Sequence, residues 1–305
     1  MAPVASVLPL LVATGVALGL GIPISKAAGG HGVHPLAFAT WPTLVAGLAF
    51  GLLAWRRQPA LQDPMRLLRF GAVAGLLGHA APMSALFWLT AEAGAGFAAL
   101  AFTLPPVFTL AITILIRVQQ PSARRLFAVA VGLSGALLLA WGRSGSLAGA
   151  GLPLLLVLAV PASIGAANVY RSLHMPPGVA GAWLAAATLL GSSVLLLLAG
   201  SIVPGLAIPA QPAAFGWLGL QVLVLVLGYQ LYFALQRRAE PVTFSFMGYV
   251  SMMTGVLSGT LVFGERLHWS TGPSALLILA ALAMLRTPEP TRSARIPART
   301  PVVQP

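Results

Sequence analysis

Residues 89–112 read LTAEAGAGFAALAFTLPPVFTLAI, a run that is long enough and apolar enough to cross a lipid bilayer. Two adjacent prolines, Pro105 and Pro106, interrupt it near its middle. Proline lacks the backbone N–H and clashes with the preceding turn, so the pair predicts a weakened helix at membrane depth. The carbonyls freed around Ala101 and Phe102 are costly in lipid and should face protein or water. This segment is either part of a ligand pathway or a kink that is stabilised by packing alone.

The composition of the whole chain is that of a polytopic membrane protein. Charged residues make up 7% of the 305 residues, against roughly 25% in an average soluble domain. Hydrophobic residues make up 58%, and the mean hydropathy is +0.92. The 17 basic residues form no continuous basic face, so the net charge of +12 indicates membrane topology rather than nucleic-acid binding. The absence of cysteine excludes disulfides, thiol catalysis and thiolate metal sites.

Ten apolar segments have the length of a membrane-spanning helix, about 20 residues. Because the runs are long and the connections short, we expect α-helices rather than the shorter alternating strands of a barrel. The first 25 residues hold no Lys or Arg, so the first segment is interpreted as a retained span and not as a cleaved signal. The predicted spans are 4–24, 35–55, 69–89, 95–116, 124–141, 152–171, 179–200, 213–235, 243–263 and 269–286.

Basic residues fall mostly on one side of these ten spans. One set of alternate connections carries ten arginines, and the C-terminal tail adds four. The other set carries only Lys26, Arg143 and Arg266. Fourteen against three predicts that both termini are cytoplasmic. The tail, residues 287–305, is rich in Pro, Thr and Arg and is expected to be a disordered cytoplasmic segment.

An internal repeat divides the chain. A shift of 145 residues carries spans 1–5 onto spans 6–10, and Lys26 then meets Arg171 at the end of the first span of each half. Because five is odd, the two halves must face opposite ways across the membrane. Inverted repeats of this kind are an architecture of secondary transporters, with substrate bound near the midplane. The expected fold is all-α, with ten transmembrane helices in two inverted five-helix repeats, residues 1–145 and 146–286.

Three stretches carry a resemblance to a known family. GIPISKAAGGHGVHPLAFA, residues 21–39, resembles the first-span signature of the EamA-type drug/metabolite transporters, in which a Lys at the helix end precedes a Pro-Leu pair. ALAFTLPPVFTLAI, residues 99–112, is similar to the family's small-residue segment followed by a proline-centred half-helix. FGERL, residues 263–267, matches the family's Gly-Glu-Arg at the end of the ninth span. The resemblance implies ten helices in two inverted halves and export from the cytoplasm.

Polar groups at membrane depth are expensive and usually face the bundle interior or a wet cavity. His79 lies deep in the third span, with Met83 on the same face at helical spacing. His79 could hydrogen-bond substrate or carry a proton, or it could be a neutral histidine bonded to a neighbouring helix. Tyr229 lies on a polar and aromatic stripe of the eighth span that suits an organic molecule, with helix contacts and an interfacial aromatic belt as alternatives. That stripe comprises Gln221, Gly228, Tyr229, Tyr232 and Gln236.

Further candidates lie in other spans. Asn168 in the sixth span could bond substrate or satisfy carbonyls freed by Pro161, while Tyr249 and Met252 share a face of the ninth span with Ser245. Lys26 and Arg171 are interpreted as anchors at the membrane interface, with a role as ligands as the alternative. The candidate substrate-binding residues are therefore His79, Met83, Thr103, Pro105, Pro106, Asn168, Tyr229, Tyr249 and Met252.

Glycines spaced by four residues indicate close contacts between helices. The pairs are Gly15 with Gly19, Gly47 with Gly51, Gly71 with Gly75, and Gly255 with Gly259. We interpret these as packing faces of a tight bundle rather than as parts of a site.

These features favour a secondary transporter of small organic metabolites, with amino acids as the favoured substrates. No GxxxxGK[ST] loop is present, so ATP drive within this chain is not expected. All five acidic residues map to loops or helix ends, so neutral or zwitterionic substrates fit better than organic cations. An intramembrane enzyme would need a clustered catalytic set, and a channel or lipid-handling scaffold fits a pseudo-symmetric pair of halves less well. No catalytic residue, cofactor or metal site is predicted.

Arg outnumbers Lys sixteen to one, and Ala, Gly and Pro abound, which suggests a bacterial chain from a GC-rich genome. The expected location is the cell inner membrane, as a multi-pass protein. The expected partners are the lipid bilayer and a small-molecule substrate, and nucleic acid is not among them. The self-contained pair of halves is compatible with a monomer.

Overall fold

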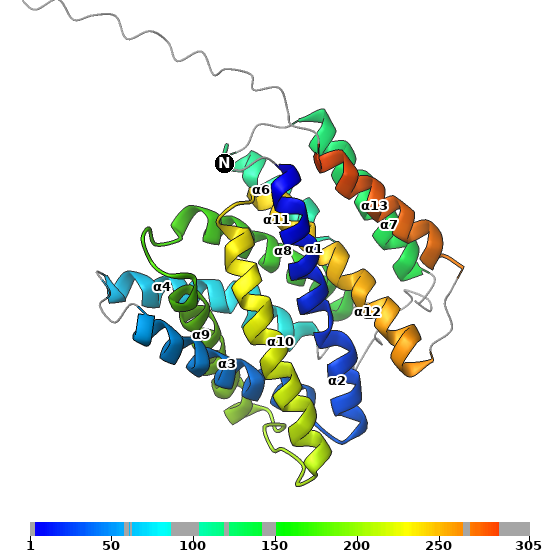
Figure 1. Cartoon of the computed structure of the whole chain (residues 1–305). Coiled ribbons are helices and arrows are strands. Elements are labelled where there is room, and N and C mark those ends of the chain that lie inside the picture. The colour runs from blue at the N-terminus through cyan, green and yellow to red at the C-terminus, as the bar shows by residue number, and fades with distance from the viewer. Residues whose placement is uncertain are drawn as a thin grey trace, which may run out of the picture.

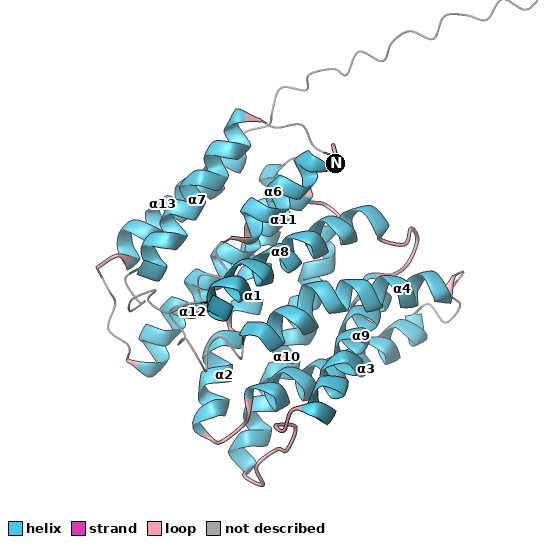
Figure 2. Cartoon of the chain, turned by 180° about the vertical axis from the view of Figure 1, so that it is seen from behind, coloured by secondary structure: helices cyan, strands magenta, loops and turns pink. Residues whose placement is uncertain are grey.

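The computed structural model describes residues 4–57, 61, 63–86, 104–118, 122–141, 151–264 and 269–286. Regular secondary structure within these ranges is helical, as the sequence predicted (Figure 2). The elements are α1 (Val4–Gly19), α2 (Gly21–Gly30), α3 (Pro35–Arg57), α4 (Pro64–Gly75), the π-helix η1 (Leu76–Ala80), α6 (Pro105–Leu115), α7 (Ala123–Trp141), α8 (Gly151–His174), α9 (Gly181–Ile202), α10 (Pro212–Gln236), α11 (Pro241–Ser245), α12 (Met247–Phe263) and α13 (Thr271–Arg286).

Five helical segments in the described residues are long and apolar enough to cross a membrane, and two shorter apolar helices accompany them. Among the five, α3, α9 and α10 match the predicted spans 35–55, 179–200 and 213–235 to within a few residues. The predicted membrane class is therefore confirmed. The five segments are Val7–Gly30, Pro35–Arg57, Gly181–Ile202, Pro212–Gln236 and Pro241–Phe263.

Three predicted spans differ from the structure in detail. The first consists of two helices, α1 and α2, separated at Leu20, and the ninth consists of α11 and α12, separated at Phe246. The third begins earlier than predicted, at Pro64, because the Asp63 carboxylate accepts the N–H of Arg66 at 2.8 Å and caps the helix. Arg66 lowers the hydropathy of the first turn of α4, so the apolar run alone predicts a later start for this span.

The proline pair lies at the beginning of a helix. Pro105 and Pro106 are the first two residues of α6 and are buried. The N–H groups at these positions have no partner within a helix, so proline is tolerated there. The predicted break therefore coincides with a helix start, while Thr103 and the carbonyls of residues 101–102 lie outside the described residues.

Close helix contacts form where the glycine pairs predicted them. A Cβ on Gly71 would lie 2.4 Å from the carbonyl oxygen of Ala187, so α4 and α9 meet backbone to backbone. A Cβ on Gly19 would lie 2.6 Å from the carbonyl oxygen of Ser251, which brings α1 equally close to α12. Gly51 is the exception, because no atom lies within 4 Å of its Cβ position.

Helices from the first half of the sequence pair with helices from the second half. α3 and α4 pack on α9, α1 packs on α12, and α6 packs on α8. α7 and α13 lie side by side at one edge of the bundle, as both views show (Figures 1 and 2). The two sequence halves are thus interlocked.

The backbone contact at Gly71 generates a test of this packing. We expect Gly71→Ala to destabilise the protein by about 1–3 kcal/mol, because the added methyl would overlap the Ala187 backbone, which cannot rotate away. Thermal unfolding of the purified protein in detergent measures the effect. Gly51→Ala is the matched control and should be neutral or slightly stabilising, since its Cβ position is open. Equal melting temperatures for the two variants would contradict the close approach of α4 and α9.

Candidate functional site

The helix that begins with α4 widens into the π-helix η1. The N–H of Ala81 bonds the carbonyl of Leu76, five residues earlier. Pro82 follows and has no N–H to offer the carbonyl of Gly78, so the regular α-helical ladder is interrupted here. Single π-helical turns are frequent at functional sites. The widened turn carries His79, the ionisable residue singled out by the sequence.

Side chains of α8 and α9 donate to the backbone carbonyls in and just before this turn. Away from water these carbonyls need such donors, because an unpaired polar group in lipid is costly. The bonds run from Arg171 Nη2 to Ala74 (3.0 Å) and from Ser163 Oγ to Leu77 (2.7 Å), while Ser192 Oγ shares its single proton between the carbonyls of Gly75 (3.2 Å) and Thr188 (2.7 Å).

Both ring nitrogens of His79 have partners. The Thr43 hydroxyl donates to the carbonyl of Ala39 at 2.5 Å, so its oxygen is left to accept from His79 Nε2–H at 3.1 Å. The Tyr229 hydroxyl then donates to His79 Nδ1 at 3.3 Å. This hydrogen-bond pattern assigns a neutral ring protonated on Nε2. A second proton could bind at Nδ1 only after the Tyr229 hydroxyl has turned away.

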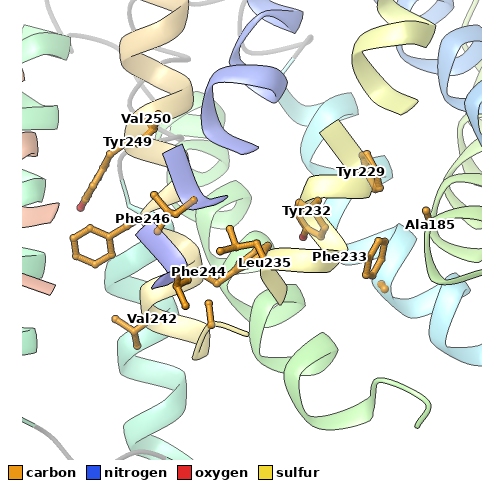
Figure 3. Close-up of a cluster of buried hydrophobic side chains, with 14 of the residues drawn as sticks. Ala185, Tyr229, Tyr232, Phe233, Leu235, Val242, Phe244, Phe246, Tyr249 and Val250 are labelled. Carbon is orange, nitrogen blue, oxygen red and sulfur yellow. The ribbon is translucent and has the colours of Figure 1, made fainter. Parts of the chain in front are cut away.

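An aromatic chain leads from His79 to a buried charge. The ring of Tyr229 meets that of His79 edge-on at 6.3 Å and stacks on Tyr232 at 5.3 Å. The guanidinium of Arg171 lies over the Tyr232 ring, 5.2 Å from its centre. Figure 3 shows Tyr229, Tyr232 and Phe233 projecting from α10 in this region.

The prediction that Arg171 anchors the membrane interface is wrong. Its side chain is 1% exposed, and it is the largest fully buried side chain of the described part of the chain. Lys26, its counterpart in the repeat, is exposed and lies over the ring of Phe263 at 4.8 Å. The two positions are equivalent in sequence but differ in environment, because Arg171 turns inward beneath the π-helix.

Five residues therefore form one connected group, which we call the π-helix cluster: Thr43, His79, Arg171, Tyr229 and Tyr232. It offers hydroxyl groups, an imidazole, two aromatic faces and one positive charge, and these groups suit the recognition of an organic molecule. Among the described residues, no three His, Cys, Asp or Glu side chains gather as a metal site would require.

The structure brings His79 and Tyr229 together and places other candidates nearby. Met83 lies one turn beyond His79 and packs against the apolar group formed by Leu36, Ala39, Ala80 and Leu196. Asn168 is 2% exposed and donates to the Thr109 hydroxyl at 3.3 Å, which ties α8 to α6 one turn from Arg171.

Tyr249 and Met252 lie elsewhere in the bundle. Both are buried in α12. Tyr249 faces α7, where a Cβ on Gly132 would lie 2.4 Å from its ring, and it points away from Tyr229 in Figure 3. Its hydroxyl has no hydrogen-bond partner among the described residues. The stripe of the ninth span therefore does not join the π-helix cluster in this conformation.

The sequence contains one signal for the depth of Arg171. Arg171 follows Asn168 by three residues, so the two polar side chains lie on one helix face. Its position at the end of an apolar segment is also that of a basic residue in a connection, so the sequence alone does not establish its depth. Thr43 gave no signal, because a threonine hydroxyl in a membrane helix usually bonds its own backbone, as Thr43 also does.

Comparison with known proteins gives three findings. Residues 5–141 match the family described as the EamA-like transporter family. The chain is 30% identical over 241 residues to the "Uncharacterized inner membrane transporter YedA" of Escherichia coli K12, covering 76% of this chain and 75% of that protein, and it is equally similar to the protein of the same name in E. coli O157:H7. A solved structure titled "Crystal structure of protein" superposes with a TM-score of 0.74 at 15% identity, covering 92% of this chain and 95% of that one, so the two share a fold.

The hydrogen bond between His79 and Tyr229 can be measured as a coupling. We expect His79→Gln and Tyr229→Phe to destabilise the protein less than additively, with a coupling free energy of about 0.5–2 kcal/mol, because each removes the same contact. Thermal unfolding of both single variants and of the double variant gives this value. Tyr249→Phe is the control: its hydroxyl has no described partner, so the change should be neutral or stabilising. Strict additivity of the pair would show that the two side chains do not touch.

Proposed function

This chain belongs to the EamA-like transporter family, and we propose that it is a secondary transporter that moves a small organic metabolite by alternating access. The observation that carries the proposal is the buried π-helix cluster, to which both halves of the sequence contribute. Thr43 and His79 come from the first half, and Arg171, Tyr229 and Tyr232 come from the second. A polar site between two repeats is where secondary transporters bind their substrates.

The helix contacts support ten spans in two inverted repeats, residues 1–145 and 146–286. Under the shift of 145 residues, the packing of α1 on α12 corresponds to the packing of α8 on α6. The contact of α4 with α9 corresponds to that of α10 with α3, while α7 and α13 are counterparts that pack on each other. This exchange of pairs is what a pseudo-two-fold axis produces. Because the pairs cross between halves, each moving unit combines helices from both.

The proposed location is the bacterial inner membrane, with both termini in the cytoplasm. The printed name of the E. coli relative, an inner membrane transporter, supports the location. The distribution of basic residues supports the orientation, with thirteen against three after the buried Arg171 is left out of the fourteen. With this orientation, the C-terminal ends of α8 and α10 face the cytoplasm, so Arg171, Tyr229 and Tyr232 form the cytoplasmic end of the π-helix cluster.

We propose amino acids as the favoured substrates. The cluster contains no carboxylate among the described residues, so a substrate with only positive charge would find no partner there. In the proposed pathway, His79, Met83 and Tyr229 are closest to the substrate. The remaining candidates, Thr103, Pro105, Pro106, Asn168, Tyr249 and Met252, would line it in another conformation.

Flux into proteoliposomes tests this proposal. We expect saturable uptake of at least one labelled neutral amino acid by the purified wild type, and a reduction of at least about tenfold for Tyr229→Ala, since it removes a buried ring and a hydroxyl from the site. If His79 carries protons, an imposed pH gradient accelerates uptake and His79→Ala abolishes the acceleration.

Gly51→Ala, which changes a position with open space around it, is the transport control and should match the wild type. Uptake at the same rate with and without the pH gradient would indicate an exchanger or facilitator. His79 would then have a structural role. Absence of saturable flux for every amino acid, with folded protein confirmed by its melting temperature, would contradict the proposed substrates.

A further inference from the structure

Arg171 is a buried cation for which the described residues provide no counterion. Two carboxylates occur in the described part of the chain: Asp63 caps α4, and Glu240 pairs with Arg125 at 2.5 Å. Among the described residues, Arg171 donates to the carbonyl of Ala74, and its Nε–H is buried without a partner. A guanidinium carries five N–H donors, so the group can bind more than this one carbonyl.

The guanidinium of Arg171 occupies space that is open because residue 78 is a glycine. A Cβ on Gly78 would lie 1.6 Å from Nη2 and 2.6 Å from Cζ of Arg171, so a side chain at position 78 would displace the charged group. The ring of Tyr232 covers the guanidinium at 5.2 Å. One turn along the same face of α10, Gln236 is 3% exposed, and both polar atoms of its amide are buried without partners.

A structural role alone leaves this arrangement unexplained. A bond to one carbonyl needs a single neutral donor, and Ser163 and Ser192 provide such donors to the neighbouring carbonyls. An unpaired charge held away from water in a membrane is expensive and in general marks a functional site. The unpartnered Nε–H of Arg171, together with the unpartnered amide of Gln236 one turn beyond Tyr232, indicates that a negatively charged group occupies this place at some stage of the cycle.

We propose that Arg171 binds the carboxylate of the transported substrate, with Tyr232 and Gln236 beside it. A carboxylate is the planar anion that the guanidinium fork matches with two parallel bonds. A single cation balances a single negative charge, which fits a monocarboxylate or a zwitterionic amino acid better than a phosphate dianion. Arg171 is closed off in this conformation, so binding occurs in a more open one. The assignment rests on the proposed transport function, of which it specifies the substrate class.

Matched probes test the charge requirement without any transport step. The purified protein in dodecyl maltoside is titrated with 3-phenylpropanoate, phenylalanine, 3-phenylpropanamide and phenethylamine at equal ionic strength, and its thermal unfolding is followed. We expect the two carboxylates to protect the wild type, and the amide and the amine to give no protection. Arg171→Gln should raise the apparent Kd for the two carboxylates by roughly 10- to 100-fold, which corresponds to the loss of a charge-assisted hydrogen bond.

Gly78→Ala provides a second variant that keeps the charge and moves it. It should weaken carboxylate binding like Arg171→Gln, whereas Gly216→Ala in α10, where nothing lies within 4 Å of the added Cβ, should bind like the wild type. Equal protection by amide and carboxylate, unchanged affinity in Arg171→Gln and Gly78→Ala, or no protection by either carboxylate would each overturn the assignment.

Counterflow of labelled phenylalanine in proteoliposomes separates this proposal from the proposed function. If the protein transports a solute that lacks a carboxylate and binds no carboxylate, the proposed transport function is supported and the proposed role of Arg171 is contradicted. Carboxylate binding that depends on Arg171, with no flux of any solute, would support the site and contradict transport.

Discussion

Backbone carbonyls inside a membrane protein must find hydrogen-bond donors away from water, and much of the described architecture follows from this constraint. The helix widens into the π-turn η1 just before Pro82, and three side chains from α8 and α9 donate to the carbonyls of residues 74, 75 and 77. Two of these donors are serines. The third is an arginine, and with it a positive charge enters the interior of the bundle.

The same turn positions the other members of the π-helix cluster. His79 projects from it between Thr43 on α3 and Tyr229 on α10, with both ring nitrogens bonded. Tyr232 links this neutral group to Arg171 by stacking on one ring and lying beneath the guanidinium. The cluster is thus one assembly drawn from four helical elements. A displacement of any one of these elements would change the contacts that its cluster residues make with the other three.

Much of this could be predicted from the sequence, and the failures have physical causes. The helices α3, α9 and α10 and the glycine contacts were predictable, because apolar length and small-residue spacing are local signals. His79 and Tyr229 were identified as polar groups at depth, and they meet. The depth of Arg171 was not predictable from local pattern, because an arginine at the end of an apolar run looks like an anchor unless its partners are known. Tyr249 was also a candidate for the substrate site, yet it faces α7, since the rotation of a helix is set by its neighbours.

The interlocked pairing of the helices has a consequence for how the protein is made. α7 ends at Trp141 and α13 begins at Thr271, so about 130 residues must be synthesised before the two can meet, roughly ten seconds at typical translation rates. In the same way, α3 can pack on α9 only after α9 has been synthesised. During this interval the early helices lie in the bilayer with lipid in place of their final partners, and the glycine faces that later form backbone contacts are covered by acyl chains. Assembly of this transporter therefore includes a late step, in which α7 and α13 associate after both have been synthesised.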